Sequence, residues 1–467
     1  MKRIPFLLVV LALLAGCAGT QLEPTPVATT EATTVPLPTT EATQAPAATA
    51  SPLPPAESPL ATATPPALDS PLPTPTPEEA AVDFAIVTVR DGDLWLKPLP
   101  GGEEVRLTDL GDVVEFPEFS PDGRLVLFRR EGPAVTISTD PAGEVPTTTL
   151  WAVPVTGGEP HMVLDPLAAL PSVPGTGGRA EDLYPSEPGS LAWLPDGRHL
   201  LLSSRYLTIN GTVGNYDLWR LDVETGQLDA LLPSGEGGRP VVSPDGAWVL
   251  LSTGTVISVA RVDGSEPRAL LKFERVPTYS EWEWVPEPEW NDDGSVRVAI
   301  ALPWMVGEPV TYQLWRLEPA SGQNEMLGEV QVSWLHAPLW SPDGTRLAFA
   351  AAGGGLALAD SSGQDPRLVA EGDDVVPLAW SPEGTRLAFV QAGQYCVVDD
   401  QAGAEPVCLA PTFYSDARWL DEDTLIMVAS IGEDQPGLVA AELPGGTTTE
   451  LWSAPVLPLF HDVYLGR

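Results

Sequence analysis

Residues 340–350 read WSPDGTRLAFA, and residues 380–390 repeat this order as WSPEGTRLAFV. In both copies Pro and an acidic residue suit the middle of a tight turn, and the next Gly accepts a left-handed backbone. The residues that come after the turn alternate between the two faces of a strand, as in Arg346-Leu347-Ala348-Phe349. The stretch therefore predicts a β-hairpin that occurs at least twice.

The same order recurs along most of the chain. Five further copies start at Phe119, Trp193, Val242, Trp290 and, in degenerate form, Trp419. A second hairpin, with a Gly-centred turn, recurs at Gly101, Gly157, Gly226, Gly264, Gly322, Gly363, Gly403 and Gly445. Two hairpins make a four-stranded antiparallel blade, so the pattern predicts an all-β fold, a β-propeller.

The second kind of hairpin occurs once more than the first, which bears on the number of blades. The first unit begins at its second strand, residues 84–89, and the apolar tail 458–465 is suited to supply the missing inner strand. We predict eight blades, with seven as the alternative, and a ring closed by pairing of the N- and C-terminal strands. An open ring would leave an unpaired strand edge.

The repeat resembles the TolB-like propeller repeats of bacterial envelope proteins, which are relatives of the WD-type repeat. The resemblance covers about residues 84–467 and is strongest in the copies at 340–350 and 380–390. The Gly-His and Trp-Asp pairs of eukaryotic WD repeats are absent. The resemblance implies a rigid docking platform for proteins or small ligands, usually without chemistry of its own.

The N-terminus carries export signals. A basic start, Met1-Lys2-Arg3, precedes an apolar run over residues 6–14 and a Cys after small residues at position 17. This order resembles a bacterial lipoprotein signal, which implies cleavage before Cys17, acylation of its thiol and anchoring in a lipid bilayer. Because Ala18 is not Asp, the pattern favours the outer membrane or, in a one-membrane cell, the outer face of the cytoplasmic membrane. A plain secretory signal is the alternative.

Three domains are expected from these features. Residues 1–16 are the expected signal peptide, and residues 17–81 are an acylated Cys followed by a Pro-, Thr- and Ala-rich linker without aromatic residues. Such a composition cannot form a core, so the linker is expected to be disordered. Residues 82–467 are the expected propeller domain.

Two cysteines remain after Cys17. Cys396 and Cys408 lie on the two strands of one predicted hairpin, within reach of each other. In an oxidising compartment we expect a disulfide between them, and two buried thiols are the alternative.

Composition and motifs limit the chemistry. The formal net charge of -40 makes nucleic acid an improbable partner. The four His fall in different units, and the sequence holds no Gly-x-Ser-x-Gly elbow and no His-Glu-x-x-His. From sequence we therefore expect no catalytic residues, no metal site and no cofactor.

The long insertions all belong to one set of connections, which places them on one face of the ring, here called the inserted face. They cover residues 130–149, 165–189, 207–216, 272–289 and 303–310. Candidate binding residues on this face are Arg130, Tyr184, Arg205, Tyr206, Tyr279, Trp282, Trp284 and Trp304. The alternative is that these loops pack on themselves.

Three functions remain open at this point. The first is a non-catalytic scaffold or sensor that docks an envelope protein on the inserted face. The second is capture of a small ligand or glycan in the central funnel. The third is a propeller enzyme, a lyase or glycan hydrolase, which needs carboxylates or His from several blades to meet at the axis.

Overall fold

A computed structural model of the 467-residue chain describes residues 84–99, 101–137, 143–174, 183–208, 211–278, 283–431, 436–453 and 461–464. Contacts divide the chain into two units, residues 1–72 and 73–467, and all described residues belong to the second. The predicted signal peptide 1–16, the acylation site Cys17 and the linker to residue 81 lie outside the described residues. Among the described residues, no helix is long and apolar enough to cross a membrane.

The described part is almost entirely antiparallel β-sheet, as predicted. The first sheet holds β3 (Val105–Arg106), β2 (Asp93–Pro98), β1 (Ala85–Arg90) and β36 (His461–Tyr464). The second holds β4 (Val113–Phe119), β5 (Leu125–Glu131), β8 (Thr148–Pro154) and β9 (His161–Leu164). The third holds β12 (Ser186–Trp193), β13 (His199–Thr208), β15 (Leu218–Asp222) and β16 (Leu228–Leu232), with β14 (Gly211–Gly214) paired to β13.

Three more four-stranded sheets come next in chain order. They are β17 (Arg239–Val242), β18 (Trp248–Ser252), β19 (Val256–Arg261) and β20 (Arg268–Lys272); β21 (Glu289–Trp290), β22 (Val296–Ala301), β23 (Val310–Glu318) and β24 (Gln323–Val332); and β25 (Leu339–Trp340), β26 (Arg346–Ala350), β27 (Leu356–Asp360) and β28 (Arg367–Ala370). The predicted hairpins around the repeated turns are confirmed here, because each repeat joins the first strand of a sheet to the second.

The last sheet is longer because one strand serves two partners. It runs through β29 (Val375–Trp380), β30 (Arg386–Gln391), β31 (Gln394–Asp399), β32 (Val407–Trp419), β33 (Thr424–Ser430), β34 (Pro436–Glu442) and β35 (Thr447–Ser453). The first part of β32 pairs with β31, and its remainder pairs with β33. One continuous strand therefore ends one four-stranded group and begins the next.

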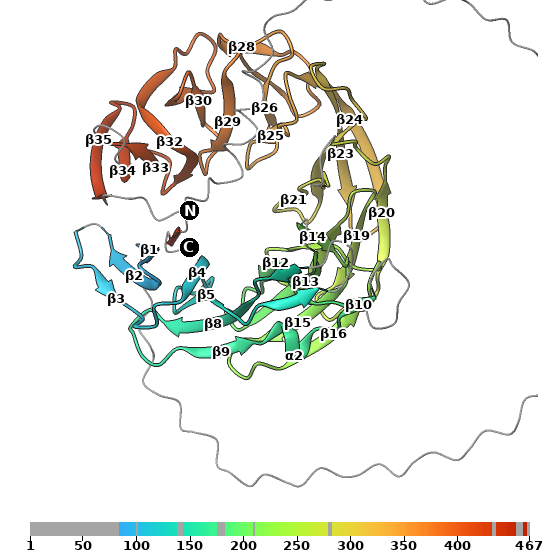
Figure 1. Cartoon of the computed structure of the whole chain (residues 1–467). Helices are drawn as coiled ribbons and strands as arrows, with labels where there is room; N and C mark the ends of the chain where they lie inside the picture. Colours follow the sequence, from blue (N-terminus) through green and yellow to red (C-terminus); the bar gives the residue numbers. More distant parts are fainter. Residues whose placement is uncertain are drawn as a thin grey trace, which may run out of the picture. The chain divides into compact units, whose positions relative to one another are not determined.

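The sheets succeed one another around a common centre, with the first strand of each group innermost (Figure 1). First strands contact one another between groups, as β12 does with β17, β25 with β29 and β36 with β4. Several innermost strands carry a proline, among them Pro117, Pro188, Pro240 and Pro377. Since proline lacks an N–H, it suits a strand whose free edge points at the centre. The arrangement is that of a β-propeller.

The core lies between consecutive sheets. One buried cluster combines Val87 and Leu94 of the first sheet with Phe119 and Phe128 of the second. Another joins the two ends of the described chain, since it contains Ile86 and Val463 together with Trp452. Each sheet is thus buried on both faces by its neighbours.

Tryptophans at the repeated turns link neighbouring sheets by hydrogen bonds. The indole Nε1 of Trp290 donates to the carbonyl of Val241 in β17 at 3.1 Å. Trp380 and Trp419 donate in the same way to Leu339 and Ala379, each at 3.1 Å. These rings pack between sheets and each satisfies its polar atom on the preceding innermost strand.

The disulfide predicted between Cys396 and Cys408 is present. The two residues are direct partners in the register of β31 and β32, with Cα atoms 3.9 Å apart. The bond joins two neighbouring strands of one hairpin.

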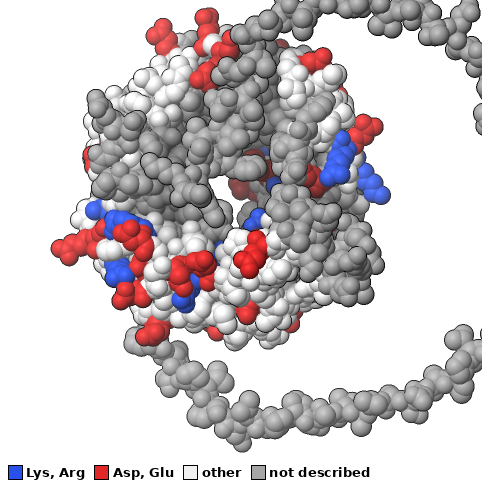
Figure 2. All heavy atoms as spheres, in the orientation of Figure 1, with Lys and Arg blue, Asp and Glu red and all other residues white. Residues whose placement is uncertain are grey.

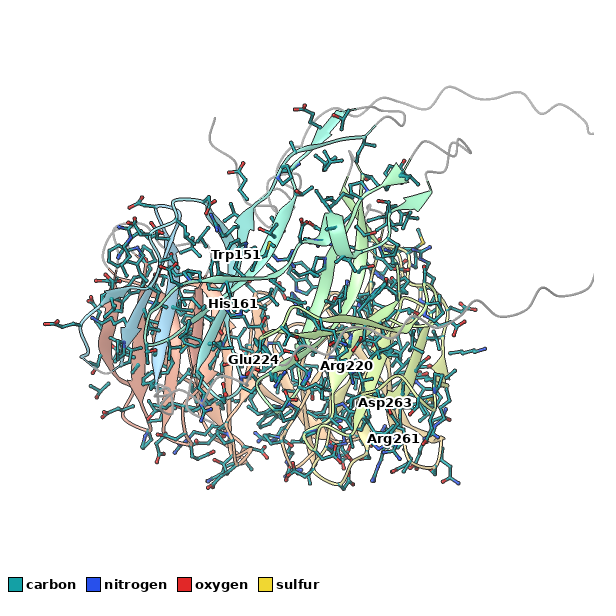
Figure 3. The ribbon with its side chains drawn as sticks, turned by 90° about the horizontal axis from the view of Figure 1, so that it is seen from below. Trp151, His161, Arg220, Glu224, Arg261 and Asp263 are labelled. Atoms are coloured by element: carbon teal, nitrogen blue, oxygen red, sulfur yellow. A yellow bond between two sulfur atoms is a disulfide. The ribbon has the colours of Figure 1, made fainter. Side chains whose placement is uncertain are left out.

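The insertions contain short elements of their own. They are β6 (Val135–Ile137), β7 (Gly143–Val145), α2 (Pro166–Ala169), β10 (Val173–Pro174) and β11 (Leu183–Tyr184). All belong either to a connection between the second and third strands of a sheet or to a connection between sheets. Figure 3 shows hairpins in the blue-green and green part of the chain that project beyond the body on one side.

Candidate active site in the central channel

The predicted binding residues of the inserted face are largely engaged within the chain. The guanidinium of Arg130 forms two hydrogen bonds of 2.7 Å to Asp112 and lies 4.3 Å from the ring centroid of Trp151. Arg205 pairs with Glu187 at 2.7 Å. Each of these arginines is thus paired with an acidic residue at the first strand of its own sheet.

The aromatic candidates are used in packing as well. Tyr184 is buried and stacks on Tyr206 with ring centroids 5.5 Å apart. Trp284 is buried against Tyr312, at 6.4 Å between ring centroids, and Trp304 packs half-buried on the same cluster. The remaining two candidates, Tyr279 and Trp282, lie outside the described residues. For the aromatic residues that the structure describes, the geometry matches the alternative of loops that pack on themselves.

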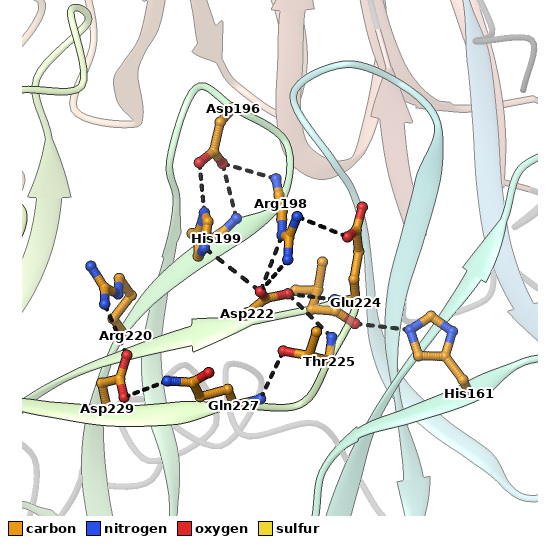
Figure 4. Close-up of polar contacts among 11 residues, drawn as sticks. His161, Asp196, Arg198, His199, Arg220, Asp222, Glu224, Thr225, Gln227 and Asp229 are labelled. Atoms are coloured by element: carbon orange, nitrogen blue, oxygen red, sulfur yellow. Dashed lines mark hydrogen bonds and ion pairs between the residues drawn. The ribbon is translucent and has the colours of Figure 1, made fainter. Parts of the chain in front are cut away.

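A polar network on the opposite face uses two of the four histidines (Figure 4). His199 Nδ1 lies 2.7 Å from Asp196, and Arg198 pairs with Asp222 at 2.6 Å. Burial alone would raise the pKa of Asp222, but hydrogen bonds from Arg198 and from backbone N–H groups lower it to about 2. His161 Nε2 reaches the carbonyl of Val223 at 2.9 Å, so it connects β9 to the next sheet. The network is structural, since it fastens turns and neighbouring sheets.

The innermost strands place ionisable side chains around the centre. Glu118 lies in β4, Glu289 in β21, Arg418 in β32 and Asp462 in β36, while His336 closely precedes β25. Figure 2 shows an opening at the centre of the molecule with both acidic and basic atoms on its wall. We call this opening the central channel. Sequence reasoning missed these residues because none belongs to a known catalytic motif.

One signal in the repeats points to three of them. Glu118, Glu289 and Arg418 each stand directly before the aromatic residue that opens the turn repeat. The other four copies have Ala192, Val241, Leu339 or Ala379 at this position. A charge at a position that is otherwise apolar indicates a use other than packing.

Glu118 and Asp462 form the most developed group on the innermost strands. Asp462 Oδ2 accepts the backbone N–H of Phe119 at 2.9 Å, and its Oδ1 accepts Arg418 Nη1 at 3.0 Å and the N–H of Val463 at 2.9 Å. An ionised carboxylate, which only accepts hydrogen bonds, suits all three donors. Asp462 is therefore held in place next to the last two residues of β4.

Glu118 is in the opposite situation. Burial raises its pKa, the negative charge of Asp462 raises it further, and Arg129 opposes both, which leaves the pKa at about 7. The two carboxyl groups thus differ in environment, one solvated by donors and one desolvated. Near neutral pH a substantial fraction of Glu118 holds a proton, whereas the carboxylate oxygens of Asp462 accept three hydrogen bonds.

A second set lies on two other sheets. Glu289 is solvent-exposed, yet desolvation by the surrounding protein raises its pKa, against the charge of Arg297, and Glu287 adds to the rise. His336 is exposed as well, and desolvation by the surrounding protein lowers its pKa. Ionisable groups therefore lie on or next to the innermost strands of several sheets. Among the described residues no group of three His, Cys, Asp or Glu is arranged to hold a metal ion.

No family model matches this chain. A curated protein of Agrobacterium fabrum, described only as uncharacterised, is 27% identical over 260 residues, which are 51% of this chain and 84% of that protein.

Solved structures with a similar arrangement include several enzymes. A puromycin hydrolase variant is 17% identical, with a TM-score of 0.42, over 81% of this chain and 54% of its own. Oligogalacturonate lyase from Vibrio parahaemolyticus is 14% identical, with a TM-score of 0.39, over 68% of this chain and 82% of its own. TolB from Acinetobacter baumannii is 14% identical, with a TM-score of 0.33, over 82% of both chains. At these identities the likeness concerns the fold.

The comparisons correct one expectation from the sequence. The non-catalytic scaffold, and with it the expectation that the chain is not an enzyme, is contradicted because most of these structures are lyases, hydrolases and peptidases. The assignment of chemistry to particular residues rests on the channel described above rather than on these names.

Proposed function

We propose that this chain is a propeller enzyme that performs acid–base chemistry in its central channel, with Glu118 as proton donor and Asp462 as the ionised partner. The observation that carries the proposal is the pair itself. Two carboxyl groups on neighbouring innermost strands have environments that favour opposite protonation states. Pairs of this kind supply a general acid and a general base at the same pH.

The proposed reaction is a hydrolysis or an elimination. Glu118 donates its proton to the leaving oxygen or nitrogen as the bond to carbon breaks. Asp462 accepts a proton either from an attacking water or from the carbon next to the breaking bond, so the protons balance. Arg418 positions Asp462, and Arg129 stabilises the charge that Glu118 acquires. Because the sequence has no Gly-x-Ser-x-Gly elbow, carboxylate chemistry is proposed rather than acyl transfer through serine.

The site depends on how the two ends of the chain meet. We infer eight blades, with β36 as the inner strand of the blade formed by β1, β2 and β3. The register of β36 with β1, from Ala85–Tyr464 to Thr88–His461, supports this inference. So does the buried cluster shared with β33 and β34. With eight blades, ring closure brings Asp462 next to Glu118.

We also propose that the enzyme works outside the cytoplasm on a lipid anchor. The support is the resemblance of residues 1–17 to a lipoprotein signal and the linker composition up to residue 81. The disulfide between Cys396 and Cys408 is in keeping with an oxidising compartment. Labelled palmitate should enter the wild-type protein in cells and not the Cys17→Ala variant, and equal labelling of both would contradict the anchor.

The function is tested by an activity screen of the purified chain. Suitable substrates are oligogalacturonate for elimination, chromogenic glycosides for hydrolysis and puromycin for amide cleavage. Wild type should turn over one class, and Glu118→Gln should reduce kcat/KM by about a hundredfold or more, the usual effect of losing a general acid. Glu236→Gln, at an exposed position outside the channel, is the matched control. Activity that survives unchanged in Glu118→Gln contradicts the proposal.

A further inference from the structure

A second polar cluster joins three sheets at the inserted face. It consists of Tyr216 from the connection after β14, Arg239 at the start of β17, and Arg275 and Glu283 from the connection between β20 and β21. β14 pairs with the third sheet, β17 belongs to the fourth and β21 to the fifth, whereas β36 belongs to the first sheet and β4 to the second. The cluster is therefore separate from Glu118 and Asp462, and a role for it is independent of the proposed catalysis.

Glu283 is the centre of this cluster. One of its carboxylate oxygens accepts the hydroxyl of Tyr216, and the other pairs with Arg275 at 2.8 Å. The carboxylate lies directly over Gly254, where an added Cβ would come within 2.4 Å of Oε1. A larger residue at position 254 would have to displace the carboxylate. Glu283 therefore packs against Gly254 and contacts both Tyr216 and Arg275.

Tyr216 is held in an unusual backbone conformation. Its φ of 50° lies in the left-handed region, which bulky side chains seldom adopt. The strained geometry is stabilised by the N–H groups of Gly235 and Gly237, which donate to its carbonyl at 3.0 and 2.6 Å. Burial, followed by the contact with Glu283, raises the pKa of the hydroxyl, so Tyr216 remains a donor. Strain that the surroundings maintain in this way is typical of functional sites.

Arg239 has no such partner. Among the described residues it is the one arginine for which the structure contains no ion pair, side-chain hydrogen bond or aromatic ring contact. This is unusual on a chain with 64 acidic and 24 basic residues, where cations are readily paired. Arg239 is exposed, and its charge, like that of Arg275, acts on the hydroxyl of Tyr216. The N–H of Gly237, two residues before Arg239, donates to the carbonyl of Tyr216, so Arg239 begins its strand close to Tyr216, while Arg275 pairs with Glu283.

We propose that Arg239 and Arg275, of which Arg275 is positioned by Glu283, bind the anionic group of a ligand, a carboxylate or a phosphate, at the inner rim of the inserted face. A guanidinium presents paired donors that match either anion. Arg275 is already oriented through Glu283, so little side-chain freedom is lost when the anion binds. The positive charge of Arg275 is balanced by Glu283, whereas that of Arg239 has no ion-pair partner among the described residues and is available to the anion.

The test is isothermal titration of the full chain with inorganic phosphate and with glucuronate, and with glucose as the uncharged counterpart of glucuronate. Wild type should bind at least one anion saturably and should not bind glucose. Arg239→Gln and Arg275→Gln should each raise the Kd about tenfold or more, which corresponds to about 1.4 kcal/mol. Arg124→Gln, on the opposite face, is the matched control and should bind as wild type does.

The two anions distinguish the possible sources. Binding of phosphate alone identifies a phosphoryl group, and binding of glucuronate identifies a carboxylate; both support the proposal. Equal binding by wild type and Arg239→Gln indicates an adventitious ion only and overturns it. Absence of saturable binding of either anion overturns it too. Because Arg239 is exposed, its replacement should leave the thermal unfolding temperature unchanged, which excludes misfolding as the cause of a loss.

Discussion

At the scale of single residues, the carboxyl group of Glu118 lies in a position that lowers the stability of the folded chain when the group is ionised. A carboxyl group in a desolvated position beside another carboxylate would be replaced by an apolar residue if only packing mattered. Four of the equivalent positions in the repeat are indeed apolar. Of the three charged residues that break the pattern, Glu118 is the one whose pKa is raised to about 7. Functional sites are where such departures from the local pattern are expected.

The free energy of unfolding should change with pH as Glu118 ionises. The folded-state pKa of Glu118, at about 7, lies above the ordinary value of 4.5, so between these values the folded chain holds a proton that the unfolded chain releases. Stability from this group is therefore complete below pH 4.5 and is lost as the pH rises to about 7. The loss should reach about 2 kcal/mol once solvent screening is allowed for.

Glu118→Gln removes this dependence because the amide does not titrate. The variant should be more stable than wild type at about pH 8 and similar to it at about pH 4. Urea unfolding at both values measures the difference, and Glu236→Gln should behave as wild type does. A variant that is less stable than wild type at the higher pH would show that the Glu118 carboxylate is stabilising and that the assigned environment is wrong.

The sequence predicted the residues that make turns far better than those that make the site. The turn from Ser341 to Gly344 is specified by local backbone preferences, which a short motif records. The contact of Asp462 with the N–H of Phe119 joins positions at opposite ends of the chain, and no local pattern encodes it. Trp284 was expected to be a binding residue because its loop belongs to the inserted face, and the sequence of a loop does not reveal which of its side chains are covered. It is buried against Phe273 and Tyr312.

At the scale of elements, the innermost strands are joined by tryptophans. Trp380 opens the turn between β29 and β30 and donates to Leu339 in the preceding sheet at 3.1 Å. Trp380→Phe keeps most of the ring's packing but leaves the carbonyl without its donor. The expected loss is about 1 to 2 kcal/mol of unfolding free energy.

Chemical denaturation of Trp380→Phe measures this loss. Trp334→Phe is the control, because the side chain of Trp334 is 46% exposed and the change should have little effect. A loss of similar size in both variants would mean that indole area matters rather than the hydrogen bond between sheets.

The hairpin of β31 and β32 is fastened by the disulfide between Cys396 and Cys408. The bond closes a short loop with a sequence separation of 12 residues. Loop-closure entropy predicts that its loss costs about 3 kcal/mol. Thermal unfolding of the Cys396→Ala, Cys408→Ala double variant measures this cost, and a reducing agent should destabilise wild type but not the variant. An unfolding temperature that does not respond to either change would contradict a stabilising role.

At the scale of the whole molecule, β36 connects the two ends of the chain. It covers the edge of β1 through residues Ala85–Thr88 and contributes Val463 to a core shared with the last sheet. A chain that ends at residue 453 should expose this edge, unfold at a lower temperature and self-associate. A synthetic peptide of residues 454–467 should restore the unfolding temperature. Unfolding identical to that of the full chain would show that β36 does not close the fold.

The prediction of a closing strand in the tail 458–465 came from counting hairpins, since every unit repeats one pattern. Within this tail β36 pairs with β1, while eight blades and a closed ring stay a prediction. The proposed enzymatic function could not be predicted in this way. The ionisable groups of the channel come from separate units, so the site exists only when the units are assembled around a centre.

The pH dependence of kcat/KM, measured on wild type and on Glu118→Gln with the substrate class that the screen identifies, decides whether Glu118 is the proton donor. Wild-type activity should fall as the pH rises through about 7, where Glu118 loses its proton, and the variant should have about a hundredfold lower activity without this transition. A wild-type profile that is flat through this range, or a variant with wild-type activity, would contradict the assignment of Glu118 as the acid.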